Sequence, residues 1–184
     1  MRRLPDEYLD VVDDDDVPTG VVKLKRAIHR DGDWHRGAHM WLYNDQGEVL
    51  FQRRSPIKDT YPNLWDITGG HVGVGESYDT TAIRELREEL GITVSLAELE
   101  RLYLYRDALI NREFQQLYLL RFNRPASVFR LQVEEVSEAR FFPISELKMR
   151  LNDPEERLAF CPVYDYYLTV LALIEERLPL PCKK

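Results

Sequence analysis

The chain has 184 residues, of which 44% are hydrophobic and 31% charged, and its net charge is −7. This length suits a single domain with a core large enough to stabilise the fold without disulfides or structural metals. The negative charge argues against a protein that binds a nucleic-acid backbone or a membrane surface. There is no long apolar run, and Cys161 and Cys182 have no metal or redox spacing. We therefore expect a soluble cytoplasmic protein with reduced cysteines.

Strand-like and helix-like segments alternate along the chain in a mixed order. Residues 7–28 indicate an edge hairpin around the aspartate run 13–16, which we interpret as an exposed turn rather than a metal site. Further strands are expected at 38–43, 48–53, 65–68, 99–106, 114–122 and 140–143. A short helix capped by Ser145 and an apolar helix over 163–177 end the chain. This order predicts an α+β fold.

Residues 70–92 carry the most informative pattern, a glycine-rich turn that runs into a helix with three acids. At roughly 100° per residue, Glu85, Glu88 and Glu89 share one narrow helix face beside an apolar stripe that must pack on a core. Carboxylates this close repel one another, and a hard cation such as Mg²⁺ or Mn²⁺ relieves that repulsion. The segment therefore predicts a metal site.

Two neighbouring residues support this interpretation. Arg84 can hold one carboxylate of the acidic face in a fixed orientation through a charge-assisted hydrogen bond, and Gly91 suits the left-handed residue that ends a helix. An isolated Glu-Glu pair is ordinarily a solvated face. Seven specified identities at these spacings should arise by chance only about once in 10⁸ windows.

With these positions filled, residues 70–92 resemble the Nudix box of the Nudix hydrolase superfamily. The resemblance implies a Nudix-type α/β/α sandwich with a mixed sheet, one catalytic helix and a C-terminal covering helix. It implies a single domain over 1–184, with a hairpin extension at 1–30 and a C-terminal helical segment at 154–178. It also implies that the catalytic metal is held by Glu85, Glu88, Glu89 and Gly70.

The superfamily also suggests roles in catalysis for Glu85, Arg84 and Glu89. Glu85 is the favoured general base because Arg84 orients it, and Glu76 is expected to organise the turn and the outer metal shell. The base varies across the superfamily, so a downstream acid is an alternative: Glu134, Glu135 or Glu138.

Outside the box, residues 8–177 resemble the isopentenyl-diphosphate isomerase branch of the superfamily. The shared pieces are Lys25–His29, His35, Gln52–Lys58, Gly70–His71 and Ala159–Pro162. The resemblance implies that a diphosphate is gripped by Lys25, Arg54 and Lys58, cations suited to phosphate oxygens. It further implies a second, tightly held metal bound by His29, His35, His71 and Glu113.

Three departures from that branch bear on the chemistry. Gly69 stands where the isomerases carry a cysteine, Gln115 replaces an acidic ligand, and Val163 replaces an aromatic residue. Isomerases typically lose the first acids of the box, whereas this chain keeps them. The groups for proton transfer across a double bond are missing, and those for hydrolysis are present.

The sequence therefore predicts a Mg²⁺- or Mn²⁺-dependent hydrolase that cleaves a small-molecule diphosphate. We expect a monomer or homodimer that binds neither nucleic-acid polymers nor membranes. The organic moiety stays open among nucleoside diphosphates, nucleotide sugars and short prenyl diphosphates. An isopentenyl-diphosphate delta-isomerase and a non-catalytic Nudix metabolite-binding module are the alternatives.

Overall fold

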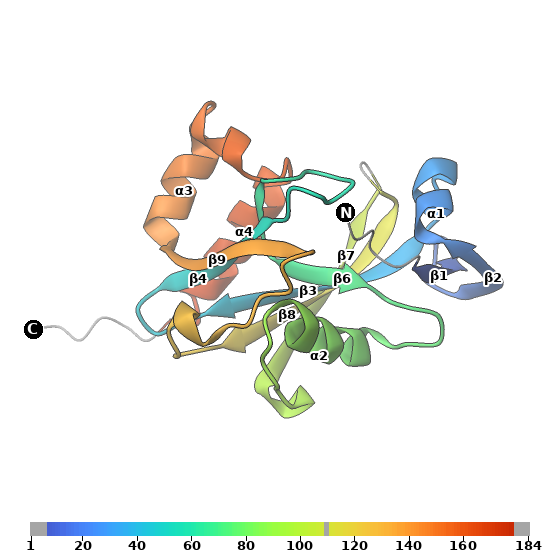
Figure 1. Cartoon of the computed structure of the whole chain (residues 1–184), viewed down its shortest axis with the longest axis horizontal. Coiled ribbons are helices and arrows are strands. Elements are labelled where there is room, and N and C mark those ends of the chain that lie inside the picture. The colour runs from blue at the N-terminus through green and yellow to red at the C-terminus, as the bar shows by residue number, and fades with distance from the viewer. Residues whose placement is uncertain (1–6, 109–110, 179–184) are drawn as a thin grey trace, which may run out of the picture. The chain divides into compact units, whose positions relative to one another are not determined.

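The computed structural model describes residues 7–108 and 111–178 (Figure 1). The strands are β1 (Tyr8–Val12), β2 (Pro18–Leu24), β3 (His35–Tyr43), β4 (Glu48–Arg54), β5 (Trp65–Asp66), β6 (Thr68–His71), β7 (Leu99–Asp107), β8 (Glu113–Arg121) and β9 (Val136–Pro143). The α-helices are α1 (Lys25–Asp31), α2 (Tyr78–Glu89), α3 (Ile144–Asn152) and α4 (Tyr164–Glu175), with short 3-10 turns at Leu96–Glu98, Ala126–Val128 and Glu156–Ala159. Within these described ranges, no helix has the length and apolarity needed to cross a bilayer. The predicted α+β class is confirmed.

Three of the predicted element boundaries were wrong. Residues 25–28, assigned to the hairpin, form the first turn of α1, which ends where Gly32 adopts a φ of 70°. β9 starts at Val136, because Val136 already pairs with Arg54 of β4. Ser145 lies inside α3 and makes no cap, since Pro143 occupies the N-cap position.

The chain divides into two compact units. The first unit comprises residues 1–40 and 68–119, of which 7–40, 68–108 and 111–119 are described. In it, β6 pairs antiparallel with β3, with Gly37 opposite His71 and Met40 opposite Thr68. Helix α2 packs against β6 (Figure 1). Leu86 and Leu90 are fully buried, so the apolar stripe of the box helix does pack on a core.

The N-terminal hairpin also belongs to the first unit. β1 pairs antiparallel with β2, and Asp13 to Asp15 are exposed as expected. Asp16 differs: its carboxylate accepts hydrogen bonds from Arg36 Nε at 2.5 Å and from Tyr78 Oη at 3.0 Å. The aspartate run is therefore a turn whose last residue is tied to β3 and α2 by partly buried polar contacts.

The second unit comprises residues 41–67 and 120–184, described as far as residue 178. β4 pairs antiparallel with both β5 and β9. The core of this second unit is aromatic. Phe51 makes edge-to-face contacts with Trp41, Phe142, Phe160 and Tyr167 at ring-centre distances of 5.3–6.1 Å. Such geometry adds to the energy of apolar burial. The predicted C-terminal helix is α4, which buries its apolar face.

Cys161 is buried and is in no disulfide among the described residues, and Cys182 lies outside them. The prediction of one domain over residues 1–184 stays a prediction.

Candidate metal centres

The guanidinium of Arg84 is the centre of the Nudix-like segment. Its Nε and Nη2 donate to the two carboxylate oxygens of Glu76 at 2.9 Å each, which is the bidentate fork geometry. Its Nη1 donates to Glu85 at 2.7 Å and to Glu88 at 3.0 Å. Nη2 also reaches the backbone carbonyl of His71 at 3.1 Å. One cation thus holds three carboxylates and the end of β6.

Glu76 organises the turn before α2, as the sequence predicts. Besides Arg84, its Oε2 accepts the backbone N–H of Gly73 at 3.1 Å and the hydroxyl of Thr81 at 3.0 Å. Ser77 then caps α2 by accepting the N–H of Thr80. A cap of this kind satisfies a backbone donor that the first turn leaves without a helical partner.

Gly70 lies directly against the Glu85 carboxylate. A Cβ at residue 70 would overlap the Cγ, Cδ and Oε1 atoms of Glu85, so only glycine lets β6 approach α2 this closely. The Gly70 backbone and the Glu85 carboxylate are therefore brought together, and their metal-holding role stays a prediction.

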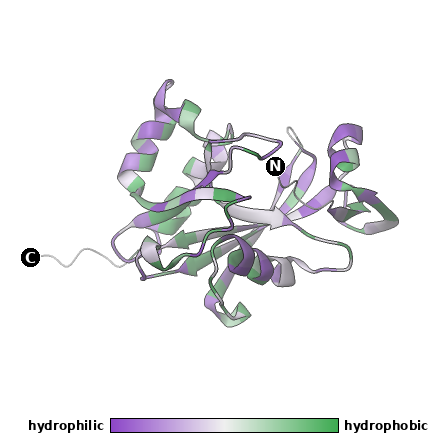
Figure 2. Cartoon of the chain, viewed as in Figure 1, coloured by the Kyte–Doolittle hydropathy of each residue, from purple (hydrophilic) through white to green (hydrophobic). Residues whose placement is uncertain are grey.

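The three box acids differ in their surroundings. Glu89 is buried with 4% of its surface exposed, Glu85 is half-buried and Glu88 is exposed, on a helix that is largely hydrophilic in colour in Figure 2. Burial raises the pKa of Glu85, and the charge of Glu88 adds to this, while Arg84 opposes both. Glu76, Glu85 and Glu88 share one guanidinium, so the cluster keeps an excess of negative charge that suits a divalent cation.

Three histidines form a second cluster in the same unit. His29, His35 and His71 each contribute one ring nitrogen, and these three atoms lie within 4.8 Å of one another. The Nε2 atoms of His29 and His35 are 3.2 Å apart. The fourth predicted ligand, Glu113, places Oε1 at 3.8 Å from His71 Nε2. The structure therefore gathers the three predicted histidine ligands, from α1, β3 and β6, and places Glu113 of β8 beside His71.

The protonation states suit metal binding. Burial lowers the pKa of both His29 and His35 to about 4, so both rings are neutral near pH 7 and offer a nitrogen lone pair. Burial raises the pKa of Glu113. Three imidazoles and a carboxylate form a donor set suited to zinc or a first-row transition metal.

The orientation of the rings gives a further indication. His35 Nδ1 lies 3.2 Å from the carbonyl of Asp33, with Nε2 turned to His29. His71 Nδ1 lies 3.8 Å from Glu7 Oε2. Metal-binding histidines usually place their second nitrogen on such an acceptor. Sequence reasoning missed Glu7, although the hairpin register, with Tyr8 opposite Leu24, places it opposite Lys25.

Two of the departures from the isomerases have structural consequences. Gln115 Nε2 donates to Glu113 Oε2 at 2.9 Å, so a neutral donor stands where that branch has an acid. At Gly69, a Cβ would come 2.7 Å from Cδ2 of His39 and 3.0 Å from the carbonyl of Ala38. A cysteine side chain does not fit there unless the His39 ring moves.

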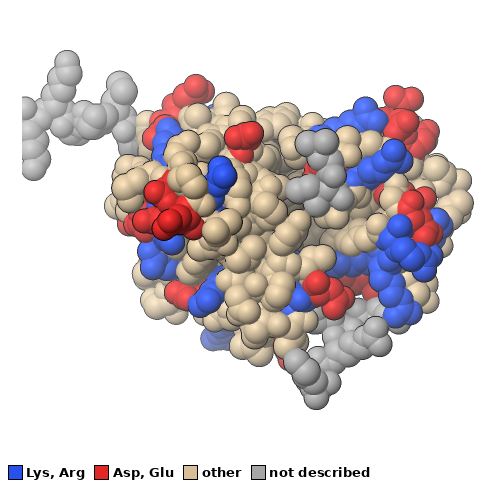
Figure 3. Space-filling model, turned by 90° about the horizontal axis from the view of Figure 1, so that it is seen from above, with Lys and Arg blue, Asp and Glu red and all other residues tan. Residues whose placement is uncertain are grey.

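Each of the three cations predicted to grip a diphosphate has an acidic partner. Lys25 Nζ lies 3.0 Å from Glu7, Arg54 lies 3.3 Å from Asp66, and Lys58 is paired with Glu135. Lys25 is in the first unit, and Arg54 and Lys58 are in the second. On the face shown in Figure 3, basic and acidic side chains are likewise interspersed. The diphosphate-binding role of these cations stays a prediction.

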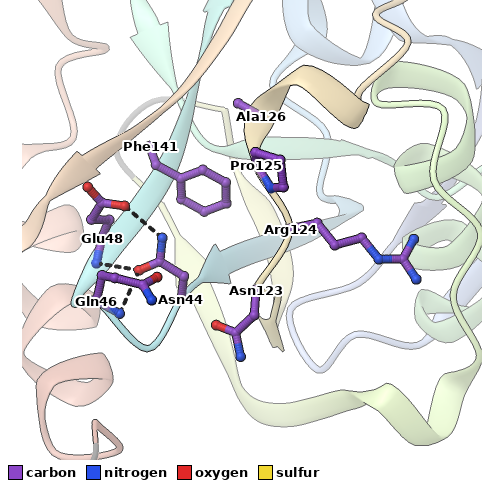
Figure 4. A pocket seen from close by; sticks show the side chains of 8 residues that line it. All are labelled: Asn44, Gln46, Glu48, Asn123, Arg124, Pro125, Ala126 and Phe141. Carbon is purple, nitrogen blue, oxygen red and sulfur yellow. Dashed lines mark hydrogen bonds between the residues drawn. The ribbon is translucent and has the colours of Figure 1, made fainter.

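The acids offered as alternative bases, Glu134, Glu135 and Glu138, also lie in the second unit. An open pocket of about 420 Å³ in that unit is lined by polar residues such as Asn44 and Asn123, with Arg124 and Phe141 (Figure 4). It contains none of the predicted site residues.

Comparisons with known proteins show the family to which the chain belongs. The NUDIX domain model matches residues 33–162. Nudix hydrolase 3 of Arabidopsis thaliana is 32% identical over 95% of this chain, which spans 24% of that relative's length. The isopentenyl-diphosphate Delta-isomerase of Pectobacterium atrosepticum is 30% identical over 85% of this chain and 91% of its own. A crystal structure from Deinococcus radiodurans has a TM-score of 0.65 and 26% identity, covering 83% of this chain and 97% of its own.

The chain therefore belongs to the Nudix hydrolase superfamily, a family of enzymes, and has the Nudix fold. Its similarity to isopentenyl-diphosphate isomerases, inferred from segments outside the box, is confirmed as well.

We predict that Gly70→Ala weakens Mn²⁺ binding at the box by about tenfold or more while the protein stays folded. The new Cβ overlaps the Glu85 side chain, which can leave by changing rotamer, so the metal-holding geometry suffers more than the core. Titration with Mn²⁺, followed by electron paramagnetic resonance, measures the affinity, and circular dichroism checks the fold. Wild-type affinity in this variant would contradict the role of Gly70.

A second prediction concerns the stability of the chelator-treated protein at low pH. The folded pKa of His29 and of His35 is about 4, below the ordinary value of 6.5, so the unfolded chain binds more protons between these limits. Stability should therefore fall as the pH drops from 6.5 to 4. Urea unfolding at several pH values measures the free energy of unfolding. His35→Gln, which cannot titrate, should show a shallower dependence, and an identical slope would refute this cause.

Proposed function

We propose that this chain hydrolyses the diphosphate linkage of a small organic diphosphate, using Mg²⁺ or Mn²⁺ held by Glu85, Glu88, Glu89 and the backbone of Gly70. The observation that carries the proposal is the set of box carboxylates around Arg84, with Glu85 pressed against Gly70. In a purely structural helix such an accumulation of negative charge would only be destabilising, whereas a bound cation offsets it.

The roles of the side chains follow from their contacts. A divalent cation at these acids supplies charge neutralisation on the diphosphate and activation of a water molecule. Arg84 fixes the carboxylates of Glu85 and Glu88, so they need no reorganisation when the substrate binds. Glu85 accepts the proton of the attacking water, and its raised pKa, caused by burial, moves it toward the range useful for a base.

The histidine cluster supports a second, tightly held metal bound by His29, His35, His71 and Glu113. The short separation of the three ring nitrogens and the neutral state of His29 and His35 favour it. Its donor set differs from the oxygen ligands of the box. The two centres are therefore proposed to hold different metals, with hydrolysis assigned to the box.

The substrate is proposed only as a class. Lys25, Arg54 and Lys58 would contact the phosphates after exchanging their acidic partners for phosphate oxygens. Nucleoside diphosphates, nucleotide sugars and prenyl diphosphates stay candidates for the organic part. A monomer or homodimer in the cytoplasm is the setting we propose for the enzyme.

The test is a panel of organic diphosphates incubated with the protein, in which released phosphate and the organic product are both identified. We expect activity that is lost with a chelator and restored by Mg²⁺ or Mn²⁺. Glu89→Gln should lower kcat by roughly 10² or more, because a metal ligand loses its charge. Glu155→Gln, at an exposed glutamate in the other unit, is the control. Unchanged turnover in Glu89→Gln would remove the box from the mechanism.

Isopentenyl diphosphate distinguishes this proposal from the isomerase alternative. We expect no dimethylallyl diphosphate, because Gly69 cannot move a proton, Gln115 does not titrate and Val163 offers no aromatic face to a carbocation. Gly69→Cys alone should also fail, since two of the three groups are still missing. Product analysis by chromatography measures the outcome. Appreciable isomerisation by the wild-type protein would overturn the hydrolase assignment.

A further inference from the structure

Glu7 is held at a fixed place beside the histidine cluster. It directly precedes β1, and its backbone carbonyl accepts the N–H of Lys25 at 2.9 Å. Lys25 is the first residue of α1, the helix that carries His29. The backbone of Glu7 is thereby tied to an element that supplies a predicted metal ligand, although its side chain is 43% exposed.

The carboxylate of Glu7 lies between a cation and a histidine. Its Oε2 is 3.0 Å from Lys25 Nζ and 3.8 Å from His71 Nδ1. The other ring nitrogen of His71, Nε2, is 3.8 Å from Glu113 Oε1. His71 thus has a carboxylate on each side: one belongs to the predicted metal ligands, and the other does not.

His35 shows the same division of its ring nitrogens. Its Nδ1 lies at the carbonyl of Asp33, and its Nε2 faces His29. An acceptor at Nδ1 keeps the proton there and leaves Nε2 free to bind a metal. For His71 the acceptor is a charged carboxylate, which also makes the ring a stronger donor to the metal.

The charge of the site gives a reason for this arrangement. Glu113 is the one acid among the four predicted ligands, and its neighbour Gln115 is neutral. A cation bound there would meet only one ligand charge. Glu7 brings a second negative charge next to the site without occupying a ligand position.

We propose that Glu7 is a positioning residue of the histidine metal site. Its carboxylate, 3.8 Å from Nδ1 of His71, attracts the Nδ1–H electrostatically and favours that tautomer, which leaves Nε2 directed at the metal and Glu113. The same carboxylate oxygen also pairs with Lys25. It therefore links the metal site to a cation that is proposed to bind the diphosphate. This role rests on the histidine site proposed above, and it does not depend on hydrolysis at the box.

The first experiment is a Co²⁺ titration of chelator-treated full-length protein, followed by visible absorption. Glu7→Gln should weaken Co²⁺ binding by about 10- to 100-fold. At saturation its spectrum should match that of the wild type, because no ligand is removed. Asp31→Asn is the matched control: it removes one negative charge at the end of α1, and Asp31 pairs with Lys23 and Arg30 rather than with a histidine. We expect it to keep wild-type affinity.

The second experiment needs no metal. Nitrogen-15 chemical shifts of the His71 ring report which nitrogen carries the proton in the neutral form. We expect the Nδ1–H form to dominate in the wild type and to decrease in Glu7→Gln, with an unchanged melting temperature showing that the fold is intact. The same tautomer ratio in both proteins would overturn the positioning role.

The remaining outcomes separate the two proposals. If the wild type binds one equivalent of Co²⁺ and Glu7→Gln binds it equally well, the role of Glu7 is wrong while the histidine site stands. If the saturated spectrum of Glu7→Gln shows a lost ligand, Glu7 is a direct ligand and not a positioning residue. If His71→Ala and the wild type both bind no Co²⁺ at the histidines, both proposals fail, and hydrolysis at the box is unaffected.

Discussion

The ion-pair network of Arg84 is the interaction on which the site depends. Its planar guanidinium binds Glu76 in the turn and Glu85 and Glu88 on the helix, and it also donates to the carbonyl of His71. Burial opposes its charge, but the hydrogen bond to Glu76 and the charge of Glu85 raise the pKa of Arg84 further above its usual range. A lysine has one donor centre and could not hold this many groups in one plane.

Strand β6 brings the two candidate metal centres next to each other. Gly70 lies against Glu85 of the box, and the ring of the following residue, His71, joins the histidine cluster. A charge beside the histidine cluster acts on the box, since Glu7, next to His71, is among the groups that raise the pKa of Glu85. Occupation of either centre by a cation is therefore expected to influence the ionisation of the other.

Relatives of this chain include isomerases, and we propose that a few side chains distinguish its chemistry from theirs. In this chain the space beside Gly69 is taken by His39, and Gln115 donates to Glu113 where an acid would repel it. At the box, all three helix acids are kept. Similar folds thus permit different reactions, because the reaction is decided by the groups at the site and not by the strands that carry them.

The sequence by itself determined the box and its helix, and it predicted the types of the proposed ligands, because the spacing follows from helical periodicity and because carboxylates and imidazoles are the groups that bind cations. It also indicated most strands through alternating hydrophobicity. Tertiary structure alone decided which groups meet. Glu7 reaches His71 only through the hairpin register, Asp16 reaches Arg36 across 20 residues, and the partners of Arg54 and Lys58 come from separate segments. Such contacts depend on how distant parts of the chain pack together, and local sequence periodicity does not predict that packing.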